Sequence, residues 1–269
     1  MLGKLFKHEF RETARVLAPL NLVLIAITLI GVILLGARFL QNDIMKLLAV
    51  TCMMFYILCI FALFVITGVY LTIRFYRTMY GSQGYLTHTL PVKTALLVNT
   101  KILISVFWCF VSLLITIGSV FLLVRVMIGD AWNLMSFQEF NAEMTAAFGM
   151  KYGQFFAILG AMLLLSCVQI ILMLFSSLSI GQLFGQHRIL ASIGAFVVFY
   201  VLQQLAGVMM TMLFGLRFMG QLTTEAEMMF FASGLYRNLM LSGMIVSLVF
   251  CIGYFISCHY ITRRYLNLE

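Results

Sequence analysis

The sequence predicts an all-α membrane protein with six transmembrane helices, on the basis of three observations. Of the 269 residues, 63% are apolar and 10% are charged, whereas soluble domains carry about 25% charged residues. The mean hydropathy is +1.08. Six charge-free apolar stretches are each long enough to cross a ~30 Å hydrocarbon core, which takes about 20 helical residues. Barrel strands would instead alternate apolar and polar residues over about 10 positions.

The predicted spans follow one another with connecting segments of different lengths between them. They cover residues 16–37, 47–73, 102–124, 154–180, 189–215 and 239–260, and residues 16–269 are predicted to form one six-helix transmembrane domain. The first stretch is too long for the apolar region of a cleaved signal peptide, and bulky Phe39 follows it where a small residue would be needed.

The distribution of Lys and Arg predicts the orientation. With both termini placed in the cytoplasm, the inner segments carry the whole formal charge of +8 and the outer segments are neutral. Because cytoplasmic loops of membrane proteins are enriched in Lys and Arg, both termini are expected inside. The basic balance therefore reflects topology, and we expect no nucleic-acid partner. The six cysteines lie in apolar runs without CxxC spacing, which is typical of small buried hydrophobic residues.

Residues 1–15 are predicted to form a separate amphipathic helix ahead of the first span. Apolar side chains recur at every fourth position on one face: Leu2, Phe6, Phe10 and Ala14. This pattern fits a helix lying in the cytoplasmic headgroup layer. It also fits a simple positively charged anchor for the first span. Pro19 would then fall in the first turn of that span, where its missing N–H costs little.

The sequence predicts local structure in three of the connecting segments. In the loop Met127–Lys151, aromatic residues at helical spacing predict a short helix on the outer interface. The apolar loop Gly215–Arg237 suggests a segment dipping back into the membrane, which is tolerated where protein covers its backbone. Gly181 and Gly185 form a GxxxG pair, which fits either close helix packing or a tight turn at a helix end.

The absence of several sequence motifs reduces the number of possible functions. No Asp or Glu lies within the six apolar cores, although ion-driven transporters usually place one there. No HExxH, GxSxG or GxxxxGK[ST] motif is present. We therefore expect no enzymatic activity and no ATP hydrolysis by this chain. An intramembrane enzyme would need a Ser/His or two-carboxylate pair at matching depth, which the sequence does not offer.

Polar and flexible side chains within the fourth and fifth spans are candidates for a substrate path. Those singled out are Gln169, Gln203, Gln204, Met209 and Met212. Amides in spans could line such a path, or they could hydrogen-bond between helices. Methionines could accept varied apolar cargo, or they could be ordinary core or lipid-facing residues.

The segment Phe75–Lys101, between the second and third spans, is the most distinctive polar stretch. It combines basic Arg77 with Tyr80 and other aromatic residues, a glycine stop at Gly84 and one of only two prolines, Pro91. Arg and Tyr are enriched at protein-docking hot spots. Aromatic residues also form belts at the headgroup level, so the residue types alone support both interpretations.

The pattern GYLTHTLPV, Gly84–Val92, followed by Lys101, resembles the second-to-third span loop of ABC-2 type transporter permeases. The opening MLGKLFKHEFRE resembles the amphipathic elbow helix of the same family. Together with six spans and two inner termini, the resemblance covers essentially the whole chain. One departure is Gln83, where many members carry a glutamate.

The resemblance implies a permease subunit of a bacterial ATP-driven exporter in the cytoplasmic membrane. Two permease chains, identical or homologous, would pair and receive separate ATP-binding subunits, which would bind ATP and Mg. The chain itself would need no cofactor, and its cargo would be hydrophobic or amphipathic. The coupling loop would include Arg77, Tyr80, Gln83, Gly84, Tyr85, Leu86 and Pro91. The alternatives are an ion-independent channel and a substrate-binding membrane subunit of an uptake system.

Overall fold

The computed structural model describes residues 2–36, 43–81, 84, 94–128, 137–185, 187–219 and 225–264. Within these ranges the chain is helical apart from short turns, and no strand occurs. The helices are α1 Leu2–Gly36, α2 Asp43–Met79, α4 Thr94–Ile128, α5 Phe137–Phe148, α6 Tyr152–Gly181, α7 Arg188–Met219 and α8 Glu225–Arg264. Six of them are long and apolar enough to cross a membrane, which confirms the predicted number of spans.

The helices group into two compact units with three long helices each. Unit 1 comprises Met1–Met79 and Leu86–Leu134, and therefore contains α1, α2 and α4. Unit 2 comprises Tyr80–Tyr85 and Met135–Glu269, and contains α5 to α8. Each unit carries its own cluster of polar contacts, as shown below.

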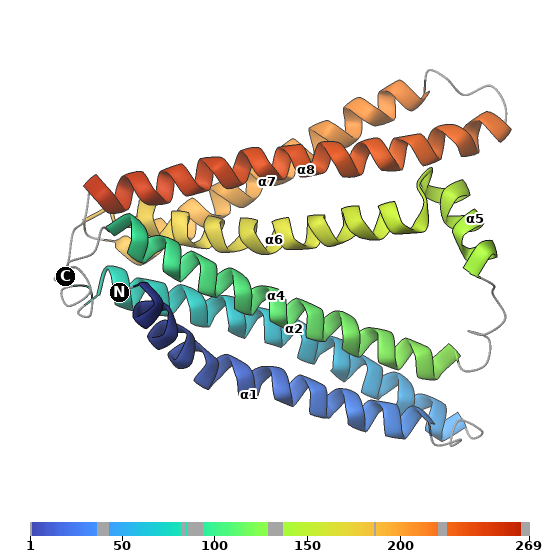
Figure 1. Cartoon of the computed structure of the whole chain (residues 1–269), viewed down its shortest axis with the longest axis horizontal. Helices are drawn as coiled ribbons and strands as arrows, with labels where there is room; N and C mark the ends of the chain where they lie inside the picture. Colours follow the sequence, from blue (N-terminus) through green and yellow to red (C-terminus); the bar gives the residue numbers. More distant parts are fainter. Residues whose placement is uncertain are drawn as a thin grey trace. The chain divides into compact units, whose positions relative to one another are not determined.

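Helix α1 continues without a break through the predicted boundary between an amphipathic helix and the first span. Pro19 consequently lies inside the helix and not in its first turn, which corrects the prediction. A proline in a helix lacks one hydrogen bond and crowds the carbonyl four residues earlier, here that of Arg15. The first turns of α1 are inclined to the rest of the helix in Figure 1.

Unit 1 is held together by one face of α1. The buried positions are spaced three or four residues apart, as a helix face requires: Thr13, Leu17, Asn21, Leu24 and Thr28. Leu24 forms an apolar cluster with Tyr56 and Leu63 of α2 and Leu123 of α4. The Tyr56 hydroxyl also lies 2.5 Å from Ser119 Oγ of α4. Helices α1 and α4 run parallel to each other and α2 runs antiparallel to both.

Unit 2 is built around α6, which packs against both α7 and α8. Its buried residues include Ile171, Met173 and Phe175, and α8 contributes Tyr254 and Cys258. The Tyr254 ring packs on Phe199 of α7, with ring centroids 4.8 Å apart.

Helix α5 confirms the short helix predicted between the third and fourth spans, and it runs across the direction of α6 (Figure 1). It stops at Gly149, whose φ of 65° is favourable for glycine and whose N–H donates to the Thr145 carbonyl at 2.9 Å. Asn141 Oδ1 accepts a hydrogen bond from the Tyr152 N–H at 3.0 Å, so α5 satisfies a free donor at the start of α6. Its position at an outer interface stays a prediction.

The loop predicted to dip back into the membrane is mostly helix. Helix α7 extends to Met219 and α8 begins at Glu225, so both helices continue beyond their predicted spans. The apolar residues of this stretch are thus largely accounted for by longer helices, which corrects the re-entrant prediction for the part that the structure describes.

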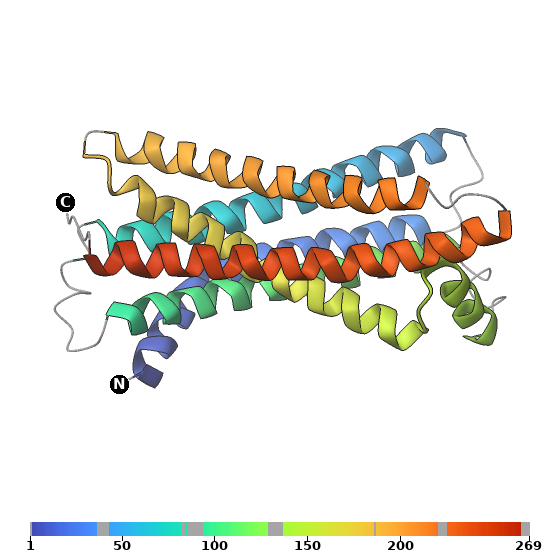
Figure 2. The same cartoon turned by 90° about the horizontal axis from the view of Figure 1, so that it is seen from above.

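Figure 2 shows the chain reversing its direction between α6 and α7. Gly181 is the last residue of α6 at this turn. A Cβ at this position would lie 1.9 Å from Ser192 Oγ and 2.7 Å from the Arg188 carbonyl oxygen, whereas a Cβ at Gly185 would meet nothing within 4 Å. Both interpretations of the glycine pair therefore apply to Gly181, which ends α6 and also lets α7 approach closely. Gly185 takes no part in that approach.

Candidate functional site

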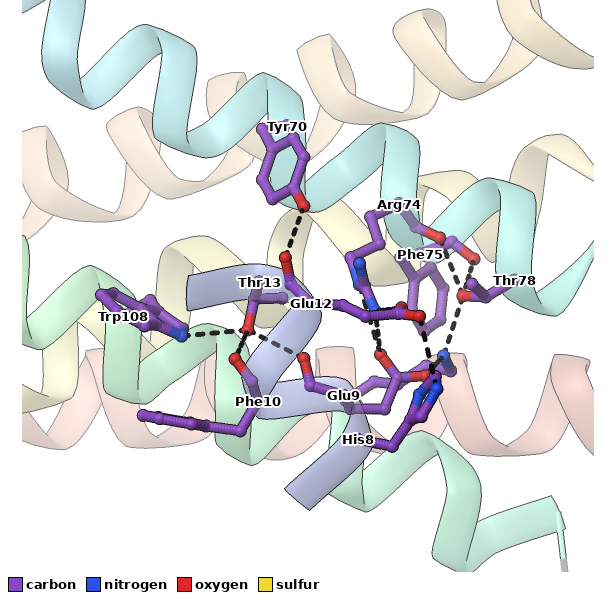
Figure 3. A network of polar contacts seen from close by, with 11 residues as sticks. His8, Glu9, Phe10, Glu12, Thr13, Tyr70, Arg74, Phe75, Thr78 and Trp108 are labelled. Atoms are coloured by element: carbon purple, nitrogen blue, oxygen red, sulfur yellow. Dashed lines mark hydrogen bonds and ion pairs between the residues drawn. The ribbon is translucent and has the colours of Figure 1, made fainter. Parts of the chain in front are cut away.

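A cluster of charged side chains in unit 1 joins α1, α2 and α4 (Figure 3). The Glu9 carboxylate accepts hydrogen bonds from Arg74 Nη2 at 2.7 Å and Arg74 Nε at 3.2 Å. Its other oxygen accepts from Lys101 Nζ at 2.6 Å. Lys101 also donates to Thr78 Oγ1 at 2.8 Å, and Arg74 pairs with Glu12 as well. We call Glu9, Arg74, Thr78 and Lys101 the Glu9 cluster.

The cluster is largely shielded from solvent. The side chains of Lys101, Glu9 and Arg74 are 8%, 14% and 16% exposed, whereas that of Glu12 is 47% exposed. Buried charges persist when they are paired and hydrogen-bonded. Glu9 pairs with both cations and Glu12 pairs with Arg74, so two carboxylates face the two cations.

A second contact fixes the same part of α1. Trp108 of α4 donates its indole N–H to Thr13 Oγ1 at 3.0 Å, and the Phe10 ring stacks on Trp108 with centroids 5.5 Å apart. Glu9 and Thr13 lie one turn apart on the same face of α1. The beginning of α1 is therefore attached to α4 by polar and aromatic contacts (Figure 3).

Unit 2 contains a separate buried hydroxyl cluster around Tyr80. The Tyr80 side chain is 1% exposed, and its hydroxyl lies 2.9 Å from Ser179 Oγ of α6 and 2.9 Å from Thr262 Oγ1 of α8. Ser179 Oγ is also 3.6 Å from Cys258 Sγ. Burial raises the pKa of Tyr80 to about 12, so the hydroxyl is neutral at physiological pH.

The predicted coupling-loop residues have different locations. Arg77 lies exposed in the last turn of α2. Tyr80 is buried in unit 2, which corrects its assignment to an exposed docking surface. Gly84 is buried, and its N–H donates to the Gly81 carbonyl at 2.7 Å. The remaining residues, Gln83, Tyr85, Leu86 and Pro91, lie outside the described ranges.

The predicted path residues are not gathered into one pocket by any contact that the structure records. Gln169 is buried on α6. Gln203 and Gln204 lie on α7, where Gln204 Nε2 donates to the Tyr200 hydroxyl at 2.9 Å on the same helix. Met209 and Met212 are exposed. A role in a substrate path stays a prediction for all five.

Sequence reasoning missed the central role of Glu9. It treated the carboxylate as part of a charged surface before the first span, because the span was taken to begin at residue 16. The helix in fact carries an unbroken membrane-length stretch from Phe6 to Leu34. The signal that could have found the site is the spacing of Glu9, Thr13, Leu17 and Asn21, which places the carboxylate above three small or apolar residues on one face.

Within each of the two clusters, the polar groups are engaged with one another. Lys101 and Arg74 are engaged by Glu9, and the Tyr80 hydroxyl by Ser179 and Thr262. In the described part of the chain, no group of three or more His, Cys, Asp and Glu side chains could hold a metal ion. The contacts of the Glu9 cluster hold the residues on both sides of the 80–93 segment, namely Arg74 and Thr78 before it and Lys101 after it.

Comparisons with protein-family models, with curated proteins and with solved structures found no match.

Proposed function

We propose that this protein is the permease subunit of an ATP-driven exporter of the ABC-2 type in a bacterial cytoplasmic membrane. It would pair with a second permease chain, and each permease would receive a soluble ATP-binding subunit. The cargo would be a hydrophobic or amphipathic molecule moved outward. ATP and Mg would be bound by the partner ATPase.

The observation that carries this proposal is the attachment of the 80–93 segment at both ends. Before it, Arg74 and Thr78 of α2 belong to the Glu9 cluster. After it, Lys101 of α4 binds the same carboxylate. Tyr80 itself is hydrogen-bonded to α6 and α8. A loop that transmits force needs ends that cannot move independently of the helices, and these contacts supply such ends.

The sequence of the segment supports the same function. Its Gly84–Val92 pattern resembles the coupling loop of ABC-2 permeases, and the chain has no phosphate-binding loop of its own. A protein driven by ATP would therefore need a partner to hydrolyse it. In this proposal exposed Arg77 contacts the partner, and buried Tyr80 positions the loop without touching the partner.

Purification in a mild detergent tests the proposal. We expect a soluble protein carrying a phosphate-binding loop to co-purify with the full-length chain, and charge reversal at Arg77 to lower the ATPase activity of the reconstituted complex. Arg264, at the end of α8, provides a matched charge-reversal control because it also lies exposed in a last helical turn. Retention of full activity by the Arg77 variant would contradict the coupling role.

The alternatives give different results in the same preparation. A substrate-binding uptake subunit would retain a small ligand when no ATPase is bound. A channel would conduct in a planar bilayer without ATP. Either result in the absence of an ATPase partner would overturn the exporter proposal.

A further inference from the structure

A pocket of about 390 Å³ lies where α5, α6 and α8 of unit 2 meet. It is lined by Gly149 and Met150 of the α5–α6 corner, Gln154, Ala157 and Ile158 of α6, and Arg237 and Leu241 of α8. Pockets of roughly 300–1,000 Å³ are typical of small-molecule sites, which combine apolar walls with a few placed polar groups. The volume and composition of this pocket fall within that class.

The polar and apolar parts of the lining are chemically distinct. Arg237 supplies a permanent cation and Gln154 an amide, and the side chains of Ala157, Ile158 and Leu241 are apolar. Among the residues that the structure describes, no carboxylate lies within ion-pair distance of the Arg237 guanidinium. An arginine fork binds phosphate or carboxylate oxygens in a bidentate manner.

The pocket is also held in shape by the surrounding aromatic residues. The Phe148 ring at the end of α5 contacts Phe155 of α6 at 4.7 Å and Tyr236 of α8 at 5.9 Å between centroids. Tyr236 directly precedes Arg237, and Gly149 turns the chain at a φ of 65°. These contacts fix the three helices around the pocket before any ligand arrives.

The position along the helices indicates how a ligand would reach it. Arg237 is the second residue of the membrane-length stretch Tyr236–Arg264, and Gln154 is the third residue of Tyr152–Gly181. Both polar groups thus lie at the ends of spans, where headgroups meet the acyl region. Gln154, Ala157, Arg237 and Leu241 are exposed, so the pocket opens to its surroundings.

We infer that this pocket binds an anionic amphiphile, with its phosphate headgroup on Arg237 and Gln154 and its acyl chain along Ala157, Ile158 and Leu241. An arginine fork beside apolar side chains can hold a phosphate headgroup while those side chains contact the acyl chain. The inference does not depend on an ATPase partner. The shared chemistry fits both a resident membrane lipid and a free amphiphile, and the experiment separates the two.

The test uses the full-length protein in a neutral maltoside detergent and native mass spectrometry. The probes are phosphatidylglycerol, phosphatidylcholine with the same acyl chains, dodecyl phosphate and inorganic phosphate. We expect phosphatidylglycerol and dodecyl phosphate to bind more tightly than the zwitterionic lipid, and inorganic phosphate not to bind measurably. A resident lipid would also be present in solvent extracts of the purified protein.

Three variants locate the binding site. Arg237→Gln removes a charged hydrogen-bonding group and should weaken phosphatidylglycerol binding by about ten-fold or more. Ala157→Phe should weaken it by filling the apolar part of the pocket while Arg237 is retained. Lys151→Gln is the matched control, because Lys151 is an exposed cation beside the pocket that does not line it.

The outcome separates a site from general charge attraction. Binding within two-fold of the parent protein in Lys151→Gln, with losses in the other two variants, supports the pocket. Equal losses in Arg237→Gln and Lys151→Gln, or no loss in Ala157→Phe when its unfolding temperature is unchanged, would overturn the inference. Loss of the co-extracted lipid in Arg237→Gln indicates a resident lipid, and its absence from the parent protein indicates a free amphiphile.

Discussion

A single carboxylate determines the local structure at one end of unit 1. Glu9 binds Arg74 and Lys101 on two different helices, and all three side chains are mostly buried. A buried charge cluster adds little net stability to a fold, but removing one member is strongly destabilising because its partner stays buried without a counter-charge. Glu9 therefore links α2 and α4 to the beginning of α1.

Replacing Glu9 with Gln should destabilise the protein by about 3 kcal/mol, because Lys101 then stays buried without a carboxylate. Adding Lys101→Met should restore most of that loss, since the uncompensated charge is removed. Thermal or denaturant unfolding in detergent measures both variants. Glu12→Gln provides the control, and its half-exposed side chain predicts a loss of at most about 1 kcal/mol. Equal losses for Glu9→Gln and Glu12→Gln would show that burial of the cluster is not decisive.

Tyr80 has an equivalent role in unit 2, and its effect depends on pH. Tyr80→Phe should lower stability by about 1 kcal/mol at neutral pH, because the hydroxyl contacts to Ser179 and Thr262 are lost. An unfolded tyrosine ionises near about pH 10, and the folded pKa is about 12. The contribution of neutral Tyr80 is thus complete below about pH 10 and is lost as the pH rises through about 12.

Unfolding measured across the alkaline range tests this assignment. The parent protein should lose stability between about pH 10 and 12 that the Tyr80→Phe variant does not lose. Tyr70→Phe is a suitable control, because the Tyr70 hydroxyl lies outside the Tyr80 cluster, 3.5 Å from the Glu12 carbonyl oxygen and within hydrogen-bond reach of Arg74. Parallel alkaline curves for the parent protein and Tyr80→Phe would contradict the role of the buried hydroxyl.

At the scale of helices, the connection between α6 and α7 depends on the absence of a side chain. Gly181 brings the end of α6 against the first turn of α7, where the backbone carbonyl of Arg188 leaves no room for a Cβ. The Gln182 N–H donates to the Leu178 carbonyl at 3.3 Å, and the Leu183 N–H to the Ile180 carbonyl at 3.0 Å. These hydrogen bonds close the helix end while α7 passes close by.

Gly181→Ala should consequently destabilise the protein by about 1–3 kcal/mol, the usual cost of forcing atoms into a packed site. Gly185→Ala should change stability little, because a Cβ there meets nothing within 4 Å. Unfolding temperatures of the two variants, compared in one detergent, measure the difference. Similar values would mean that the turn relaxes and that the close approach is not required.

At the scale of the whole molecule, hydropathy predicted the six spans correctly, and the spacing of aromatic residues predicted the short helix α5. Hydropathy did not predict the helix ends. Glu9 and Arg74 lie in charged segments that hydropathy excludes from a span, but both residues lie in helices because their charges are paired. For the same reason, hydropathy did not predict the Glu9 cluster. Lys101 and Arg77 look alike in sequence, but only the packing of α1 shows that Lys101 is buried and Arg77 is exposed. Tyr80 likewise looks like a surface aromatic until its partners on α6 and α8 are known.

The distribution of Lys and Arg predicts the orientation of the chain in the membrane, and this prediction can be tested. With both termini in the cytoplasm, a fluorescent protein fused after Glu269 should fold and fluoresce, and so should one inserted after Ser82. A fusion placed after Asp130 should be dark, because the same reporter does not fold when exported unfolded. Fluorescence from the Asp130 fusion alone would contradict the predicted topology and indicate the opposite orientation.

We propose that the last turn of α2 and the segment after it contact a separate ATPase. Site-specific photocross-linking in intact cells tests this contact, with a photoreactive residue in place of exposed Arg77 and, as control, in place of exposed Gln154, which the predicted topology assigns to the outer side. We predict that position 77 captures a soluble protein with a phosphate-binding loop and that position 154 does not. The absence of that product at position 77, or equal capture at both positions, would contradict the account.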